Sequence, residues 1–241
     1  MIGIIGALGE EVDLVCSRLK KPQALTRAGI VFHKGKLGNL DVTVVKCGVG
    51  KVNAAICTQI LVDVFQCRRI VFGGVAGALL PGLKQGDVVI SSHAVQFDID
   101  LTAFGRRQGE LADHDRLIEA DPGMVRAATA AFDEQAERLK TVPEMVVGTI
   151  VSGDRFISDP DTIKWLQREF SGVCTEMEGG AVGYTCKINQ IPFVIIRIIS
   201  DSAGSDAVEE FDSFLSKSSE MLADLISGTI RHFAPVLPDV G

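Results

Sequence analysis

Short apolar runs rich in β-branched residues alternate along the chain with stretches that favour helices, and this alternation restricts the possible folds most strongly. The runs are Ile2 to Ile5, Val42 to Val45, Ile70 to Phe72, Val88 to Ile90, Val146 to Val151 and Phe193 to Ile199. The helical stretches are Lys51 to Val64, Pro122 to Arg138, Asp161 to Phe170 and Glu178 to Ile188. Continuous apolar runs of this length suit strands covered on both faces. The pattern predicts an α/β domain with a largely parallel or mixed sheet.

The end of the chain carries one apolar stripe at helical spacing, formed by Phe211, Phe214, Leu215, Leu222, Leu225, Ile226 and Phe233. The stripe predicts an amphipathic helix that packs on the sheet. The tail 234–241 contains two prolines and ends in glycine, so we expect it to be flexible. With 241 residues, 46% of them hydrophobic, the rest of the chain can form a single domain over 1–233.

Charge and composition argue against several classes of partner. The chain has 24 Lys and Arg against 31 Asp and Glu, a net charge of −7, and no basic stripe, so nucleic acid is not expected to bind. Arg197 interrupts the longest apolar segment and Glu10 follows the first, so we expect no membrane span or signal peptide and a cytoplasmic location. The six cysteines form no C-x-x-C motif and the four histidines are far apart. We therefore expect no metal site and no cofactor.

The first candidate site is a glycine-marked turn, Gly3-Ile-Ile-Gly6-Ala-Leu-Gly9-Glu10-Glu11, where the first strand meets a helix. Its glycine spacing is not that of the G-x-G-x-x-G dinucleotide motif. Acids at a helix start often only complement the helix dipole, and that interpretation stays open. They would also repel a phosphate at the sheet edge where α/β proteins bind ligands.

Two further loops contain small or aromatic residues after a strand. The segment Phe72-Gly73-Gly74-Val75-Ala76-Gly77 could be a tight turn or could let the backbone approach a flat ligand. In Ser152-Gly153-Asp154-Arg155-Phe156-Ile157, the aromatic and aliphatic pair could stack on a base or fill the core.

Charged residues in apolar surroundings mark the last two segments. Glu176 and Glu178 flank Met177 before an apolar helix, where they could cap the helix or take part in chemistry. Arg197 lies in a strand that ends at Asp201, and a buried guanidinium needs a carboxylate. Four strand residues separate Arg197 from Asp201 by roughly 13 Å. We therefore expect its partner to come from elsewhere, with Glu11 or Glu178 available.

Taken in order, these segments resemble the 5′-methylthioadenosine/S-adenosylhomocysteine nucleosidases of the nucleoside phosphorylase superfamily. The resemblance also covers Cys47-Gly-Val-Gly50-Lys51, Gly86-Asp-Val-Val, Asp100-Leu-Thr-Ala-Phe-Gly105 and Phe211, and so includes most of the chain. It implies a three-layer αβα sandwich around a mixed, partly closed sheet, and a homodimer with sites near the interface. It further implies hydrolysis of 5′-methylthioadenosine, S-adenosylhomocysteine and 5′-deoxyadenosine to adenine and a 5-substituted ribose.

The resemblance also implies residue roles. Asp201 corresponds to the acid that protonates adenine N7, Glu11 to the residue that activates water, and Arg197 to a residue that orients the acids and the water. Glu178 and Met177 correspond to the ribose site, and Phe156 and Ile157 to the adenine site. The 5′ pocket would contain Leu8, Val49, Phe211 and Phe104 from the partner subunit, and the remaining substrate contacts would come from Ala7, Val75, Ala76 and Glu176.

These roles suit the chemistry. Adenine is a poor leaving group as an anion, so general acid help is worth about 10² to 10⁴ in rate, and Asp201 must then carry a raised pKa. The ribose becomes cationic, which a carboxylate stabilises. Val75 replaces a frequent hydroxyl residue, so a support for Asp201 or the water is expected to be missing. Arg155, Gly179 and Gly180 also depart from the common pattern.

Three alternatives remain at this point. A phosphorylase would need arginines and free amides at the first glycine turn, where this chain has Glu10 and Glu11. A nucleosidase acting on aminodeoxyfutalosine is compatible with the 5′-pocket residues. A non-catalytic nucleoside-binding protein would be expected to lack Glu11 or Asp201, and both are present.

Overall fold

The computed structural model describes residues 1–111, 114–201 and 207–233, with the backbone alone for 207–213 and 215–217. Its strands are β1 Ile2–Gly6, β2 Lys20–Arg27, β3 Ile30–Leu37, β4 Leu40–Lys46, β5 Arg69–Ala78, β6 Val88–Gln96, β7 Ile118–Glu119, β8 Met145–Ser152, β9 Gly172–Glu176 and β10 Phe193–Asp201. Its helices are α1 Gly9–Ser17, α2 Lys51–Asp63, α3 Pro122–Ala136, α4 Pro160–Phe170, α5 Gly179–Ile188 and α6 Ala207–Arg231, with a 3₁₀ turn η1 Thr102–Phe104.

One mixed sheet runs in the order β10-β6-β8-β9-β5-β1-β4-β3-β2, with β7 beside β6. Strand β10 also pairs with β5, so five strands close on themselves while β1, β4, β3 and β2 extend outward. This is the mixed, partly closed sheet that the resemblance implied.

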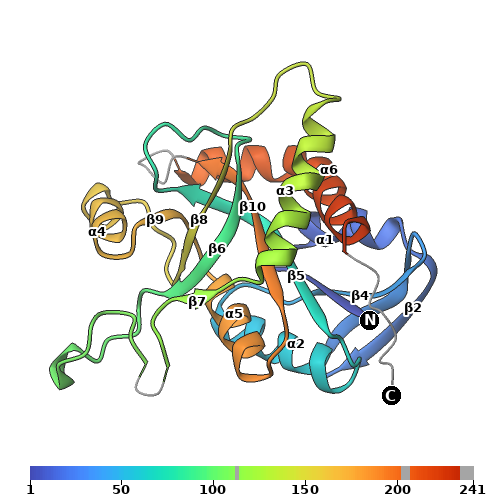
Figure 1. Cartoon of the computed structure of the whole chain (residues 1–241), viewed down its shortest axis with the longest axis horizontal. Helices are drawn as coiled ribbons and strands as arrows, with labels where there is room; N and C mark the ends of the chain where they lie inside the picture. Colours follow the sequence, from blue (N-terminus) through green and yellow to red (C-terminus); the bar gives the residue numbers. More distant parts are fainter. Residues whose placement is uncertain (112–113, 202–206, 234–241) are drawn as a thin grey trace.

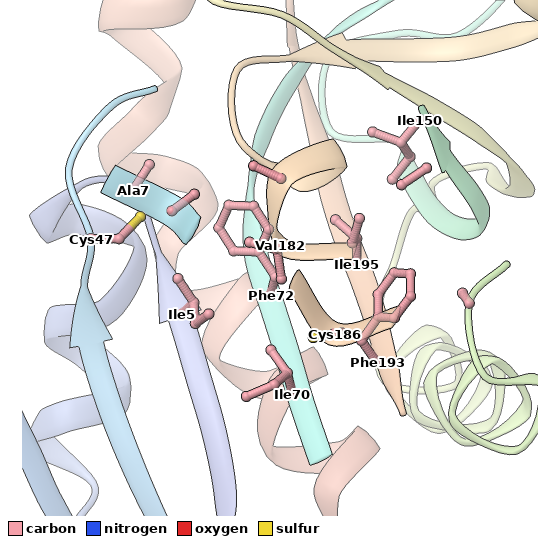
Figure 2. Packing of buried hydrophobic residues seen from close by; sticks show 14 of the residues in the cluster. Ile5, Ala7, Cys47, Ile70, Phe72, Ile150, Val182, Cys186, Phe193 and Ile195 are labelled. Atoms are coloured by element: carbon pink, nitrogen blue, oxygen red, sulfur yellow. The ribbon is translucent and has the colours of Figure 1, made fainter. Parts of the chain in front are cut away.

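Helices cover both faces of the sheet (Figure 1). Helices α2 and α5 contribute Leu61 and Val182 to one core, whose packing between the strands Figure 2 shows. Helices α1, α3 and α6 contribute Val15, Phe132 and Leu222 to the core on the other face. The three-layer arrangement is therefore confirmed, and α4 adds a small separate cluster beside β8 and β9.

All six apolar runs form strands and the predicted helices are present, but the hairpin β2–β3 has no such run. Strand β2 is exposed along nearly all of its length because it is the outer strand of the sheet. The hairpin turns at Ala28 and Gly29, both with positive φ, as in the turns that favour tight hairpins. This hairpin could therefore be predicted only from the residues of its turn, because it contains no hydrophobic run.

The neighbouring strands β4, β1, β5 and β10 are parallel, so their carboxyl ends meet at one edge. Cys47, Ala7, Gly77 and Asp201 lie at these ends. This is the edge at which open α/β sheets bind ligands. Among the described residues, no helix combines the length and apolar character needed to cross a bilayer. The tail 234–241, expected to be flexible, lies outside the described residues.

Candidate active site

A pocket of about 260 Å³ opens at this edge of the sheet, and its concave, mostly apolar lining is typical of a small-molecule site. Most residues that the sequence nominated line it: Ala7, Leu8, Glu11, Val49, Val75, Ala76, Phe156, Ile157, Glu176, Met177, Glu178 and Asp201. Gly77, Arg155, Thr175 and Ser200 complete the lining. Segments more than 190 residues apart in the sequence, such as Ala7 and Asp201, are therefore brought together.

Glu11 lies in the first turn of α1, but its carboxylate does more than complement the helix dipole. Oε2 accepts hydrogen bonds from the amides of Ala7 at 2.6 Å and Leu8 at 2.9 Å, and Oε1 accepts one from Val75 at 3.1 Å. Gly74 allows this approach, because a Cβ there would lie 2.7 Å from Glu11 Oε1. Burial raises the pKa of Glu11, although Arg197 and the three amides act in the opposite direction.

Arg197 is 1% exposed and its ion-pair partner is Glu176, with Nη2 and Oε2 2.5 Å apart. The expectation that Glu11 or Glu178 would be the ion-pair partner was therefore wrong. Glu176 is the last residue of β9, where it pairs with Ser152 of β8, and its side chain reaches Arg197 of β10. The guanidinium also lies over the Phe72 ring, 3.9 Å from the centroid, which compensates part of its desolvation.

Glu176 has little freedom to turn toward a ligand. Besides Arg197, its carboxylate accepts hydrogen bonds from the Ser152 hydroxyl and from the amides of Glu178 and Gly179. The Ser152 hydroxyl in turn accepts a hydrogen bond from the amide of Gly180 at 2.6 Å. A Cβ at Gly180 would lie 2.7 Å from the Gln96 side chain and 3.1 Å from Ser152. The glycine pair at 179 and 180 therefore fits this tightly packed corner.

Glu178 is 5% exposed and lies at the start of α5. Its Oε1 accepts a hydrogen bond from the amide of Gly50 at 2.7 Å, in the turn between β4 and α2. Burial, followed by the negative charge of Glu176, raises the pKa of Glu178. The carboxyl therefore binds a proton more readily than an exposed glutamate does.

Asp201 ends β10 just past an irregularity in the pairing with β5, and it is 3% exposed. Its Oδ2 accepts a hydrogen bond from the Ser200 hydroxyl at 2.7 Å. Gln85 Nε2 donates to the Ser200 carbonyl at 2.7 Å and so holds the strand end. A hydroxyl therefore supports Asp201 although residue 75 is valine. The sequence analysis missed Ser200 and Gln85, and only the position of Ser200 next to Asp201 could have signalled its role.

The apolar part of the pocket is built from several loops. Ile157 is buried whereas Phe156 and Val49 are each about half exposed, at 47% and 49%. Phe104 is 83% exposed and does not line the pocket of its own chain. Phe211 falls on α6 outside the residues whose side chains the structure describes.

Comparisons with known proteins agree with this fold. Residues 1–231 match the phosphorylase superfamily. The 5′-methylthioadenosine/S-adenosylhomocysteine nucleosidase of Geobacillus sp. WCH70 is 36% identical over 226 residues, 93% of this chain and 95% of its own. The corresponding nucleosidase of Pseudoalteromonas translucida is 38% identical over 236 residues, 98% of both chains.

Solved structures show the same similarity. S-adenosylhomocysteine nucleosidase from Streptococcus pyogenes, in complex with 5-methylthiotubericidin, superimposes with a TM-score of 0.90 at 32% identity, covering 97% of both chains. Futalosine hydrolase of Helicobacter pylori gives a TM-score of 0.90 at 30% identity, covering 96% of this chain and 97% of its own. This chain belongs to the phosphorylase superfamily and, within it, to the 5′-methylthioadenosine/S-adenosylhomocysteine nucleosidases, enzymes that hydrolyse N-ribosyl bonds.

Proposed function

We propose that this enzyme hydrolyses the N-glycosidic bond of 5′-methylthioadenosine and S-adenosylhomocysteine, releasing adenine and the 5-substituted ribose. One observation carries the proposal. Three buried carboxyl groups line a single pocket with apolar walls: Glu11 from the first turn of α1, Glu178 from the start of α5 and Asp201 from the end of β10. Cleavage of this bond needs acids with different tasks on either side of the sugar.

Asp201 is the proposed general acid, which donates a proton to adenine N7 as the glycosidic bond lengthens. Asp201 is 3% exposed, and a general acid at this position would need a raised pKa to hold its proton at neutral pH. The Ser200 hydroxyl donates to Oδ2 and so helps to fix the orientation of the carboxyl group.

Glu11 is the proposed base for the attacking water. Three backbone amides fix the direction of its carboxylate, and burial raises its pKa toward the range in which it can accept a proton at neutral pH. Arg197, held by Glu176, is proposed to orient Glu11 and the water. A Cβ at Gly74 would be 2.7 Å from both Arg197 Nη1 and Glu11 Oε1, which places these two groups beside one another.

Glu178 and Met177 are proposed to hold the ribose, and the Glu178 carboxylate would stabilise the positive charge that the sugar gains. Phe156, Ile157, Val75 and Ala76 would enclose adenine, while Ala7, Leu8 and Val49 would contact the 5′ substituent. Both oxygens of Glu176 already accept hydrogen bonds from Arg197 or the Gly179 amide. Glu176 is therefore proposed to influence the substrate indirectly, through Arg197 and through the backbone next to Glu178. Phe211 is proposed as a further wall of the 5′ pocket.

A homodimer is proposed because large apolar side chains are exposed on η1 and on α2. Phe104 is 83% exposed, and on α2 Val52 and Ile56 are 70% and 42% exposed one turn apart. Phe104 would then reach the 5′ pocket of the partner subunit. We also propose a cytoplasmic location, which the six cysteines support, since all are free and five are buried.

Attack by phosphate is disfavoured by the start of α1. The amides of Ala7 and Leu8, which could otherwise bind an anion, donate to the Glu11 carboxylate. A phosphate would meet that carboxylate instead of free donors. Water is therefore the proposed nucleophile.

A second candidate substrate is aminodeoxyfutalosine, because futalosine hydrolase of Helicobacter pylori shares this fold at 30% identity over nearly the full chain. The apolar 5′ walls would also accept 5′-deoxyadenosine. Both substrates would undergo the same hydrolysis of the N-glycosidic bond, and they differ only in the 5′ group.

The proposal is tested by measuring adenine release from these four nucleosides with and without phosphate. We expect release without phosphate and a free 5-substituted ribose as the second product. Phosphate-dependent formation of a ribose 1-phosphate would contradict hydrolysis. Binding of adenine without any turnover would identify a binding protein instead.

A further inference from the structure

Three loops beside the pocket are joined by a closed ring of contacts among Lys51, Asp98 and Asp154, which we call the clasp. Lys51 Nζ lies 2.5 Å from Asp98 Oδ1, the amide of Asp154 donates to Asp98 Oδ2 at 3.0 Å, and the amide of Lys51 donates to Asp154 Oδ1 at 2.8 Å. The side chains of Lys51 and Asp98 are only 16% and 23% exposed. The ring therefore links the start of α2 with the ends of β6 and β8, with its Lys51–Asp98 pair mostly shielded from water and Asp154 exposed at the surface.

The local backbone is shaped for this ring. Gly50 is the N-cap of α2, has no side chain to cap the helix, and adopts φ +100°. Asp154 supplies the missing carboxylate to the first turn of α2, where backbone amides lack partners within the helix. A Cβ at Gly50 would lie 3.2 Å from Asp154 Oδ1, so glycine allows the two segments to approach.

The clasp connects directly to the proposed ribose site. The amide of Gly50, one residue before Lys51, donates to Glu178 Oε1 at 2.7 Å. Within the described part of the chain, no other hydrogen bond reaches the Glu178 carboxylate. Only the φ and ψ torsions of Gly50 separate the two amides, so fixing the Lys51 amide on Asp154 limits the positions open to the Gly50 amide.

We infer that Lys51, Asp98 and Asp154 are positioning residues that hold the Gly50 amide beneath Glu178 and so fix the orientation in which this carboxylate meets the ribose. The inference rests on the proposed role of Glu178 in the nucleosidase reaction. The clasp residues act through Gly50 and do not themselves line the pocket.

The same hydrogen bond influences protonation. Burial and the charge of Glu176 raise the pKa of Glu178, while the bond from Gly50 and the charge of Arg197 lower it. Glu11 also faces this group and raises its pKa, and the Cys47 thiol lies near enough to be affected by Glu178. Losing the Gly50 bond would raise the pKa of Glu178 further, so less ionised carboxylate would be present at neutral pH.

The test compares Lys51→Met and Asp98→Asn with wild type, using 5′-methylthioadenosine over the pH range in which each protein stays folded. We expect kcat/KM to fall roughly tenfold, as when a contact supporting a ligand-binding group is lost. The acid limb of the pH profile should move to higher pH. Lys51→Arg, which keeps a cation opposite Asp98, should retain most activity. Lys36→Met is the matched control, because Lys36 forms an exposed ion pair with Asp41 at 3.0 Å.

A second comparison uses 2′-deoxy and 3′-deoxy analogues of the substrate. If the clasp acts through Glu178, the loss caused by Lys51→Met should shrink with the analogue that lacks the hydroxyl held by Glu178. An unchanged pH profile in Lys51→Met and Asp98→Asn, or equal losses on all three substrates, would overturn the inference. If Lys51→Met does not fold, Asp98→Asn carries both comparisons. Failure of the proposed function is a different result, since wild type itself would then release no adenine.

Discussion

The Arg197 guanidinium and the Glu176 carboxylate form an ion pair at 2.5 Å in which 1% and 4% of the side-chain surfaces are exposed. Removing one member of such a pair leaves an uncompensated buried charge. Arg197→Met should therefore destabilise the protein by about 3–5 kcal/mol, and the double variant with Glu176→Gln should recover part of this loss. Urea unfolding at neutral pH measures both values. A single variant as stable as wild type would show that the pair does not hold this corner of the sheet.

Asp201→Asn and Glu11→Gln test the two proposed proton-transfer groups. Each substitution keeps the shape of the side chain but removes the carboxyl group that donates or accepts a proton. Because general acid or base help is typically worth about 10² to 10⁴ in rate, each variant should lose at least about a hundredfold in kcat. The measurement is adenine release, with circular dichroism to confirm the fold. Wild-type rates in either variant would mean that its role has been assigned to the wrong residue.

Glu178→Gln should reveal the energetic effect of the raised pKa through the pH dependence of stability. Because folding raises the pKa of Glu178 above its ordinary value of 4.5, the native protein retains a proton that the unfolded chain releases. Wild type therefore loses stability as pH rises from about 4.5 until the native carboxyl has ionised. Glutamine does not titrate, so the stability of the variant relative to wild type should increase across this range and then level off.

Thermal and urea unfolding at a series of pH values test this prediction. Glu137→Gln, at an exposed glutamate after α3, is the matched control and should give a much flatter difference. A Glu178→Gln variant that becomes less stable relative to wild type as pH rises would contradict the sign of the shift.

Hydrophobic patterning predicted six of the strands, but it missed β9, which is buried at every position. Strand β10 is buried at every position and its apolar run was recognisable despite Arg197. The exposed strand β2 lacked this signal because its side chains are mostly polar and face water. Sequence patterns report burial, so an outer hairpin has to be found through its turn residues.

The sequence named individual residues of the candidate site, but it did not predict which of their side chains contact one another. The sequence segments and the resemblance pointed to Glu11, Glu178 and Asp201, yet the partner of Arg197 was sought in Glu11 or Glu178 and not in Glu176. The end of β9, where Glu176 pairs with Ser152, brings this carboxylate to Arg197. Hydrogen bonds such as Lys51–Asp98 and Gln85–Ser200 join loops that are more than 40 residues apart in the sequence. A periodic hydrophobic pattern carries no information about such contacts, so the roles of Ser200 and the clasp could not be predicted from it.

Thr175, in the pocket lining, tests how much a buried hydroxyl without a hydrogen-bond partner affects stability. It lies on β9 opposite Gly77 of β5 and is 6% exposed. Its hydroxyl has no hydrogen-bond partner in the described part of the chain. A buried hydroxyl without a partner loses its hydration and gains nothing in return, so the nearly isosteric Thr175→Val should raise the free energy of unfolding by about 1 kcal/mol.

The matched control for this prediction is Thr229→Val. The Thr229 hydroxyl is also buried, but it donates to the Leu225 carbonyl at 2.7 Å on α6. Removing a satisfied hydroxyl should lower the free energy of unfolding by about 1 kcal/mol, so the two valine variants should move in opposite directions. Urea unfolding midpoints at constant m-value give both changes. Equal losses in the two variants would show that the Thr175 hydroxyl is satisfied in solution by a group such as an ordered water.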